Sequence, residues 1–170
     1  MKFFAFLTAL VVLLSSGCAS YTWKSNVPND KRTVFVSAVR NESEVLEMGN
    51  VLSRQLAREF QREGTYKLSD AENCALEVQC TIKVLPLNLL LNTDRESNSR
   101  RRSWRYKAEA IVSFIDKKAG KVLVDNRKYE GYTSFYSDND LLSAKRGASG
   151  RIAEDIARQI VDDALDLKWE

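Results

Sequence analysis

One segment of the chain, residues 74–85, alternates apolar and polar residues with the period of a β-strand. Alternate side chains of a strand lie on the same face, so this pattern places an apolar row and a polar row on opposite sides. Such alternation is typical of a sheet with one face covered and the other in water. The apolar row is Cys74, Leu76, Val78, Cys80, Ile82 and Val84, and the polar row is Glu77, Gln79, Thr81 and Lys83. Any fold of this chain must therefore cover one side of the strand.

The two cysteines of this segment, Cys74 and Cys80, are predicted to be buried thiols. Six residues apart in one strand, they would be separated by roughly 20 Å at about 3.3 Å per residue. That separation is far beyond the reach of a disulfide. The chain contains no histidine, so the commonest base that could activate a thiol is also absent from it.

Two other segments repeat apolar residues every three or four positions, as amphipathic helices do. The first predicted helix covers residues 45–63. Gly64 is expected to end it, and Asn41 to cap it, with Glu44 three residues later as in a capping box. The second predicted helix covers residues 151–167. The apolar faces are Val45, Met48, Leu52, Leu56 and Phe60 in the first helix, and Ile152, Ala153, Ile156, Ala157, Ile160, Val161, Ala164 and Leu165 in the second.

The remaining strand signals complete the order of elements. Strands are predicted at residues 33–39, 66–68, 106–115 and 122–132, with a break of the first one at residues 40–43. The polar link 116–121 contains Gly120 and predicts a hairpin between the last two strands. The order β-α-β-β-β-β-α predicts an α+β fold: one mixed β-sheet of four or five strands with two helices packed on one face.

The N-terminus has the pattern of an export signal. Lys2 is followed by an uncharged apolar run at residues 3–14 and then by Ser-Ser-Gly-Cys. The run is shorter than the roughly 20 residues of a spanning helix. We therefore predict a lipoprotein signal peptide at residues 1–17, lipid on Cys18, a lipidated tether at 18–32 and a single domain at 33–170. The alternative is an ordinary secretory signal with an incidental cysteine. The residues next to Cys18, Ala19 and Ser20, include no Asp, which in lipoproteins of this type favours anchoring at the outer membrane, facing the periplasm.

Composition argues against several classes of function. The formal net charge is +3, and loss of Lys2 with the signal peptide leaves 3 − 1 = +2, too small to indicate nucleic-acid binding. No cofactor or metal is expected, because no motif with metal-ligand or catalytic spacing is present. The acidic residues Asp138, Asp140, Asp162 and Asp163 are interpreted as solvated charges. We therefore expect a protein that is not an enzyme.

The segment 86–105 breaks the pattern, because it is too long for a simple hairpin turn. It begins with leucines and ends with clustered arginines, and residues 93–107 carry six positive and two negative charges, a net of +4. Apolar residues beside guanidinium groups suit an amphiphile with anionic headgroups. Alternatively, the leucines extend a solvated hairpin and the arginines face water. The candidate ligand-binding residues are Leu89, Leu90, Leu91, Arg95, Arg100, Arg101, Arg102 and Arg105.

The order of these segments resembles the LptE family, the lipoprotein component of the outer-membrane lipopolysaccharide translocon. Tyr21 and Trp23 follow Cys18 closely, and the first strand ends in Arg-Asn-Glu-Ser, similar to the Asn-x-Ser/Thr of the family. Residues 69–77 are similar to its Ala-Asp-x-x-Leu entry into a strand, and the last helix ends near Trp169. The resemblance implies a plug inside an LptD-type β-barrel partner, support of that partner's assembly, and binding of lipopolysaccharide. The alternative is another lipoprotein adaptor, such as an activator of a cell-wall synthase or a secretion-pore subunit.

Overall fold

A computed structural model describes residues 26–86, 88–90, 103–136 and 140–169. The predicted signal peptide and Cys18 lie outside these residues. A short 3-10 helix, η1 (Asn29–Lys31), precedes a mixed sheet in the order β3-β1-β4-β6-β7, with two short strands, β2 and β5, pairing with β4 and β6. The strands are β1 (Thr33–Val36), β2 (Arg40–Asn41), β3 (Lys67–Leu68), β4 (Leu76–Val84), β5 (Asn88–Leu90), β6 (Ser103–Asp116) and β7 (Lys121–Tyr136).

The pairings fit the strands' covalent connections. β1 runs parallel to β3 and β4, because the chain returns through a helix between them. β4 and β6 pair antiparallel over nine positions, from Leu76 opposite Asp116 to Val84 opposite Ala108. β6 and β7 form the predicted hairpin, and each is longer than the sequence pattern indicates.

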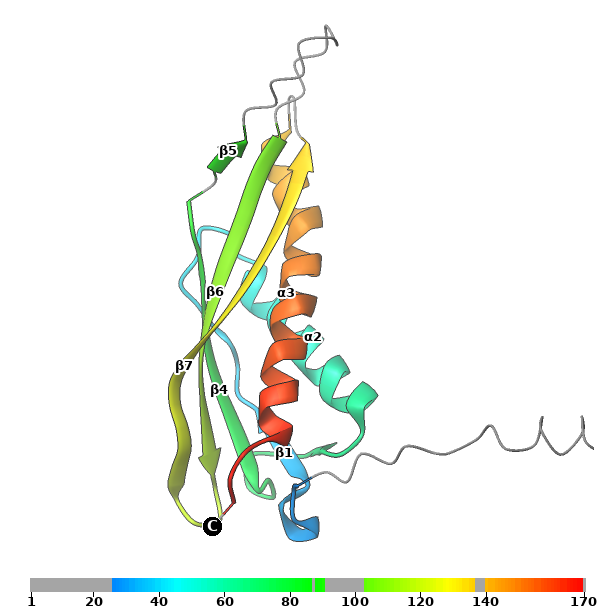
Figure 1. The fold of residues 1–170 in the computed structure, drawn as a ribbon, viewed down its shortest axis with the longest axis vertical. Coiled ribbons are helices and arrows are strands. Elements are labelled where there is room, and N and C mark those ends of the chain that lie inside the picture. Colours follow the sequence, from blue (N-terminus) through cyan, green and yellow to red (C-terminus); the bar gives the residue numbers. More distant parts are fainter. Residues whose placement is uncertain (1–25, 87, 91–102, 137–139, 170) are drawn as a thin grey trace, which may run out of the picture.

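Helices α2 (Met48–Glu63) and α3 (Leu141–Leu165) cover the same face of the sheet (Figure 1). The predicted apolar rows meet there: Leu52, Leu56, Phe60, Ile152, Ile156 and Ile160 are fully buried, against Leu76, Val78, Ile82 and Phe114 of the sheet. The predicted α+β class, with both helices on one face of a mixed sheet, is confirmed. Neither described helix combines the length and the apolar composition needed to cross a membrane.

The apolar face of β4 matches the prediction. Leu76, Val78, Cys80 and Ile82 are buried, while Gln79 is exposed on the other face. Cys74 and Cys80 are both free thiols. Burial raises the pKa of Cys80 to about 12, so this thiol stays protonated and unreactive at neutral pH.

The predicted capping box at Asn41 is wrong. Asn41 belongs to β2, opposite Ile82, and its amide donates to the carbonyls of Val45 (2.9 Å) and Leu46 (3.1 Å). α2 begins later, at Met48, and its N-cap residue Glu47 makes no side-chain cap bond. Asn41 therefore stabilises the turn before the helix, not the helix terminus. The predicted end at Gly64 is confirmed, with a left-handed φ of 85° that suits a residue without a Cβ.

α3 begins at Leu141, ten residues before the predicted start at Arg151. These first turns continue the buried face of the helix. Leu141 and Ala144 pack against the core, and Ala148 and Ser149 are buried, but the small size of the last three makes the apolar pattern weak. Asp140, expected to be merely solvated, caps this helix by accepting a hydrogen bond from the backbone N–H of Ser143 (3.0 Å).

α3 is held close to β7. Asp163, also expected to be solvated, accepts hydrogen bonds from Arg127 (2.7 Å) and from the Tyr129 hydroxyl (2.6 Å). Gly131 allows the close approach: a Cβ there would lie 2.9 Å from Ile156 Cγ1 and 3.0 Å from the backbone oxygen of Ile152. The helix therefore packs directly on the strand's backbone at this position.

Candidate functional site

The two ends of the elongated domain differ in construction. We call one end the base: residues 26–32, the turn 116–121 and residues 167–169. We call the other end the apex: β5, residues 103–105 of β6, residues 132–136 of β7 and residues 140–142. In Figure 1 the base is at the bottom, where the described chain begins and ends, and the apex is at the top.

A nearly buried ion pair joins the parts of the base. Lys31 Nζ lies 2.5 Å from Asp116 Oδ2, and their side chains are 14% and 3% exposed. The same ammonium lies 5.3 Å from the centroid of the Trp169 ring, within cation–π range. One lysine therefore ties the start of the domain to the β6–β7 turn and to the C-terminal residues. Val27, inside the predicted tether, is buried against the domain.

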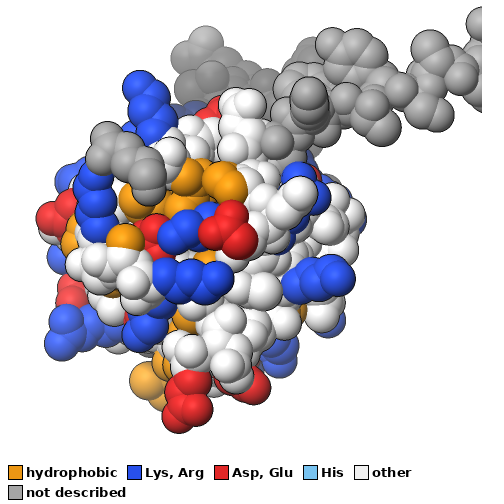
Figure 2. Space-filling model, turned by 90° about the horizontal axis from the view of Figure 1, so that it is seen from below, with side chains coloured by type: hydrophobic (Ala, Val, Ile, Leu, Met, Phe, Trp, Pro, Cys, Tyr) orange, Lys and Arg blue, Asp and Glu red, His pale blue; other side chains and the backbone are white. Residues whose placement is uncertain are grey.

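The pKa of Asp116 is held below its ordinary value. Burial alone would raise this pKa, but Lys31 and the backbone N–H groups of Ala119 (3.1 Å) and Lys118 (3.0 Å) outweigh it by binding the charged carboxylate. Lys118 also donates to the backbone oxygen of Asp30 (3.1 Å). Viewed from below, the base shows apolar side chains near its centre with charged side chains beside them, and further lysine and arginine side chains toward the edges (Figure 2).

The apex carries four of the seven large apolar side chains that are exposed among the described residues; the other three are Leu46, Leu68 and Val122. Leu89 is 44% exposed, Tyr132 69%, Tyr136 63% and Leu142 57%. Single exposed apolar residues are ordinary on protein surfaces, but contiguous groups of them mark interaction sites. These four come from β5, β7 and α3, which all reach the apex (Figure 1). By register and alternation, Tyr132 and Tyr136 share one face of the sheet, and Leu89 lies on the other.

The structure describes only part of the predicted ligand site. Arg95, Arg100, Arg101, Arg102 and the side chains of Leu90 and Leu91 lie outside the described set. β5 pairs with β6, as the hairpin alternative expects: Asn88 lies opposite Arg105 and Leu89 opposite Trp104. Because successive side chains of a strand alternate, Leu89 and the exposed Arg105 project from opposite faces of the sheet.

The outer edge of β7 is open at the apex, a feature that the sequence analysis missed. Among the described residues, β7 pairs only with β6. The carbonyl of Lys107 accepts from Leu85 N, on the side away from β7, so Lys107 and Tyr132 form a non-hydrogen-bonded pair. Glu130, two residues earlier on β7, shows the same direction: its carbonyl faces outward and accepts a hydrogen bond from the Gln159 side chain of α3 (3.0 Å). By alternation, the N–H and C=O groups of Tyr132, Ser134 and Tyr136 point away from the sheet.

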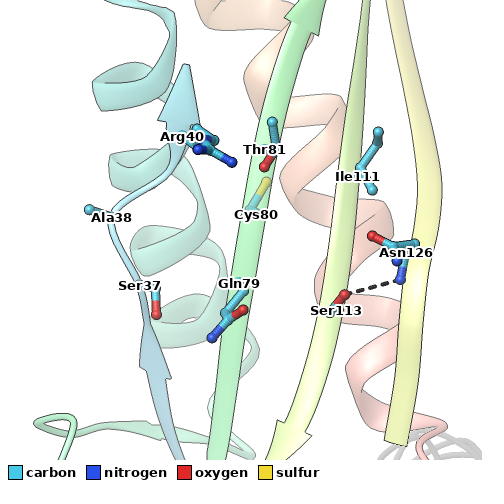
Figure 3. A pocket seen from close by; sticks show the side chains of 9 residues that line it. All are labelled: Ser37, Ala38, Arg40, Gln79, Cys80, Thr81, Ile111, Ser113 and Asn126. Atoms are coloured by element: carbon cyan, nitrogen blue, oxygen red, sulfur yellow. Dashed lines mark hydrogen bonds between the residues drawn. The ribbon is translucent and has the colours of Figure 1, made fainter. Parts of the chain in front are cut away.

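A shallow polar hollow lies on the sheet face opposite the helices (Figure 3), with a volume of about 300 Å³. Ser113 and Asn126 form one side of it, where Asn126 N donates to Ser113 Oγ (3.0 Å) at an irregularity of the β6–β7 ladder. The other side includes Ser37, Arg40, Gln79 and Thr81. Within the described ranges, no three potential metal ligands cluster, and this hollow pairs no nucleophile with a base.

Solved structures share the fold at low sequence identity. The hypothetical protein CT253 from Chlamydia trachomatis aligns with a TM-score of 0.51 at 13% identity, over 81% of this chain and 97% of that one. A putative neuraminyllactose-binding hemagglutinin homolog from Helicobacter pylori aligns with a TM-score of 0.50 at 15% identity, over 81% and 84%. At such identities the likeness concerns the fold alone. No curated protein sequence matches the chain.

A protein-family comparison gives a more specific result than the fold. The model of one family, described as LptE, lipopolysaccharide-assembly, matches residues 32–164. The match begins just before β1 and ends within the last turn of α3, so it includes the whole sheet and both helices. The chain therefore belongs to the LptE lipopolysaccharide-assembly family.

Proposed function

We propose that this protein is a non-enzymatic lipoprotein of the outer membrane, facing the periplasm, that supports assembly of an LptD-type β-barrel, plugs it, and binds lipopolysaccharide. Membership of the LptE family supports the general role in lipopolysaccharide assembly. The observation that carries the contact with a protein partner is the open apex, where an unpaired strand edge lies beside exposed apolar side chains.

The edge of β7 suits an extended segment of the partner. Outward N–H and C=O groups at Tyr132, Ser134 and Tyr136 can bond a further strand, as in β-strand addition. Residues 131–136 are uncharged, whereas charged side chains usually protect exposed strand edges from pairing. Three outward residues are few compared with the 20–30 residues per partner of a stable interface. The partner must therefore make other contacts too, and the exposed apolar residues of the apex supply them.

The base is the end of the domain that a lipid on Cys18 would hold near the membrane. Cys18 precedes the buried Val27 by nine residues, which span at most about 30 Å when fully extended. Lipid on Cys18 would thus keep the base within that distance of the bilayer surface. A single acyl chain holds a protein only marginally, so stable anchoring requires more than one.

Co-purification of the lipidated protein from outer membranes tests the proposal. We expect a large β-barrel protein to accompany the parent chain, and expect Cys18→Ser to remain unprocessed and to incorporate no labelled fatty acid. Equal labelling of the two would contradict the anchor. Capture of a cell-wall synthase or a secretion pore in place of a barrel would favour the alternative adaptor role.

Binding of purified lipopolysaccharide tests the ligand. Replacing Arg100, Arg101, Arg102 and Arg105 with glutamine should weaken binding and reduce its salt sensitivity. Each charge-assisted hydrogen bond is worth roughly 1.5–3 kcal/mol when shielded and much less when exposed. The control is Arg62→Gln, the same type of substitution on α2, outside the apex. Unchanged affinity of a folded loop variant at low salt would remove these arginines from the ligand site.

A further inference from the structure

A groove runs between the two helices, on the side of the domain away from the sheet. Val51, Arg54, Gln55 and Arg58 of α2 line it on one side, and Arg146 and Gly150 of α3 on the other. Its volume is about 410 Å³. A Cβ at Gly150 would have no neighbour within 4 Å, so the α3 side of the groove is open. Three guanidinium groups therefore border one cavity that has no acidic residue in its lining.

The arginines of the two helices fall into two groups. Arg62 pairs with Glu59, Arg158 pairs with Glu154 (3.2 Å), and Arg151 donates to the Thr133 hydroxyl (3.3 Å). The other three, Arg54, Arg58 and Arg146, have no hydrogen bond or ion pair with any described residue, and Arg146 interacts with Asp140 only through space. All three arginines without a bonded partner line the groove.

The three neighbouring positive charges repel one another and lower the stability of the domain when no anion is bound. Arg54 and Arg58 are four residues apart on α2, and like charges at that spacing destabilise a helix by a few tenths of a kcal/mol. Arg146 adds a third positive charge from the facing helix. A multiply charged anion in the groove would remove this repulsion and supply acceptors for the guanidinium donors and for the Gln55 amide.

We propose that the groove between α2 and α3 is a binding site for a phosphate group, held by Arg54, Arg58 and Arg146. Guanidinium groups bind phosphate through paired, nearly parallel hydrogen bonds. A phosphate ester presents several acceptor oxygens and up to two negative charges at one position, which matches three arginines lining one groove better than a single carboxylate does. The phosphate can belong to a lipid headgroup or to a soluble molecule. The site uses residues of the two helices and none of the 86–105 segment, and it does not depend on the proposed function.

The test uses the full-length protein in a neutral detergent. Inorganic pyrophosphate is titrated calorimetrically for the soluble source. For the lipid source, the melting temperature is compared in micelles containing phosphatidic acid or phosphatidylcholine, because a ligand that binds only the folded state raises it. The test variant carries Arg54→Gln, Arg58→Gln and Arg146→Gln. The control carries Arg62→Gln and Arg158→Gln, which remove two paired arginines from the same helices.

We expect the groove variant to bind pyrophosphate about tenfold more weakly than the parent, or to lose the phosphatidic acid shift, and to melt no lower than the parent. The control should bind as the parent does. Arg58→Lys keeps the charge but loses the paired geometry, and it should bind with intermediate strength. The proposal is overturned if neither probe binds the parent, if the groove and control variants weaken binding equally, or if citrate binds as tightly as pyrophosphate.

Discussion

The base and the apex are opposite ends of the same sheet, and they differ in how far their side chains and backbone groups are buried and paired. At the base, Asp116 and Lys31 satisfy one another in a nearly buried pair, and Val27 and Leu167 are covered. At the apex, four large apolar side chains face solvent, and the edge of β7 keeps unpaired backbone groups. Side chains that are paired or buried within the domain contribute to its stability. Exposed apolar side chains and unpaired backbone groups are available to a partner. Substitutions at the base should therefore change folding, and substitutions at the apex should change binding.

The largest effect on stability should come from the ion pair of the base. Asp116→Asn leaves the Lys31 ammonium without its counter-charge in a nearly buried position, and we expect the free energy of unfolding to fall by about 3 kcal/mol. Urea denaturation at pH 7 measures it. Glu130→Gln, which breaks the exposed pair with Lys107, is the control and should cost less than about 1 kcal/mol. Equal losses would show that the base is not specially stabilised.

The pH dependence of the free energy of unfolding should reveal the contribution of the same ion pair. The pKa of Asp116 is lowered in the folded state, so its contribution is complete above the unfolded value, about 3.9, and disappears as the pH falls through the folded value. The difference in stability between the parent and Asp116→Asn should therefore shrink as the pH is lowered below about 4. Urea denaturation of both proteins between pH 6 and pH 2.5 tests this. A difference that stays constant to the lowest pH would contradict the assignment.

A substitution at the contact of α3 with β7 should have an intermediate effect on the free energy of unfolding. Gly131→Ala places a methyl group within 3 Å of Ile156 and of the Ile152 backbone, and overpacking of this kind costs about 1–3 kcal/mol. Gly147→Ala on α3 is the matched control, because its Cβ would meet nothing within 4 Å. The control should be neutral or stabilising by up to about 1 kcal/mol, since alanine favours helices. Thermal unfolding of the two variants gives the comparison.

The smallest effect on stability should come from the apex. Tyr136→Ser and Leu142→Ser replace exposed side chains, and each should change the free energy of unfolding by less than about 0.5 kcal/mol. The same substitutions should reduce the amount of partner recovered with the protein, because they remove apolar contact area. Unfolding and co-purification of each variant are compared with those of the parent. A large loss of stability would mean that these side chains belong to the fold and not to an interface.

Sequence patterns predicted what depends on local periodicity. The buried row of β4, the apolar face of α2, the β6–β7 hairpin and the end of α2 at Gly64 all follow from residues close together in the chain. The first turns of α3 were missed, since the buried residues that follow Leu141 there, Ala144, Ala148 and Ser149, are small and give only a weak apolar pattern. Asn41 was misassigned because its short side chain can satisfy a turn as readily as a helix terminus.

Features that combine residues far apart in the chain could not be predicted in this way. Lys31 and Asp116 are 85 residues apart, and only the sheet topology brings them together. The groove combines Arg54 and Arg58 with Arg146 from a different helix. The outward direction of the Tyr132 backbone depends on the register of β6 against β7. Of the predicted ligand residues, the structure describes the side chains of Leu89 and Arg105 only, so the role of that segment stays a prediction.

Photo-crosslinking in intact cells tests the central claim, that the apex and not the base holds the partner. A photoreactive residue replaces Tyr136 at the apex or Lys118 at the base, both of which are exposed. We predict that the apex position forms a crosslink with a large β-barrel protein of the outer membrane and that the base position does not. A barrel crosslink from Lys118 together with none from Tyr136, in proteins that are equally abundant and folded, would contradict the account.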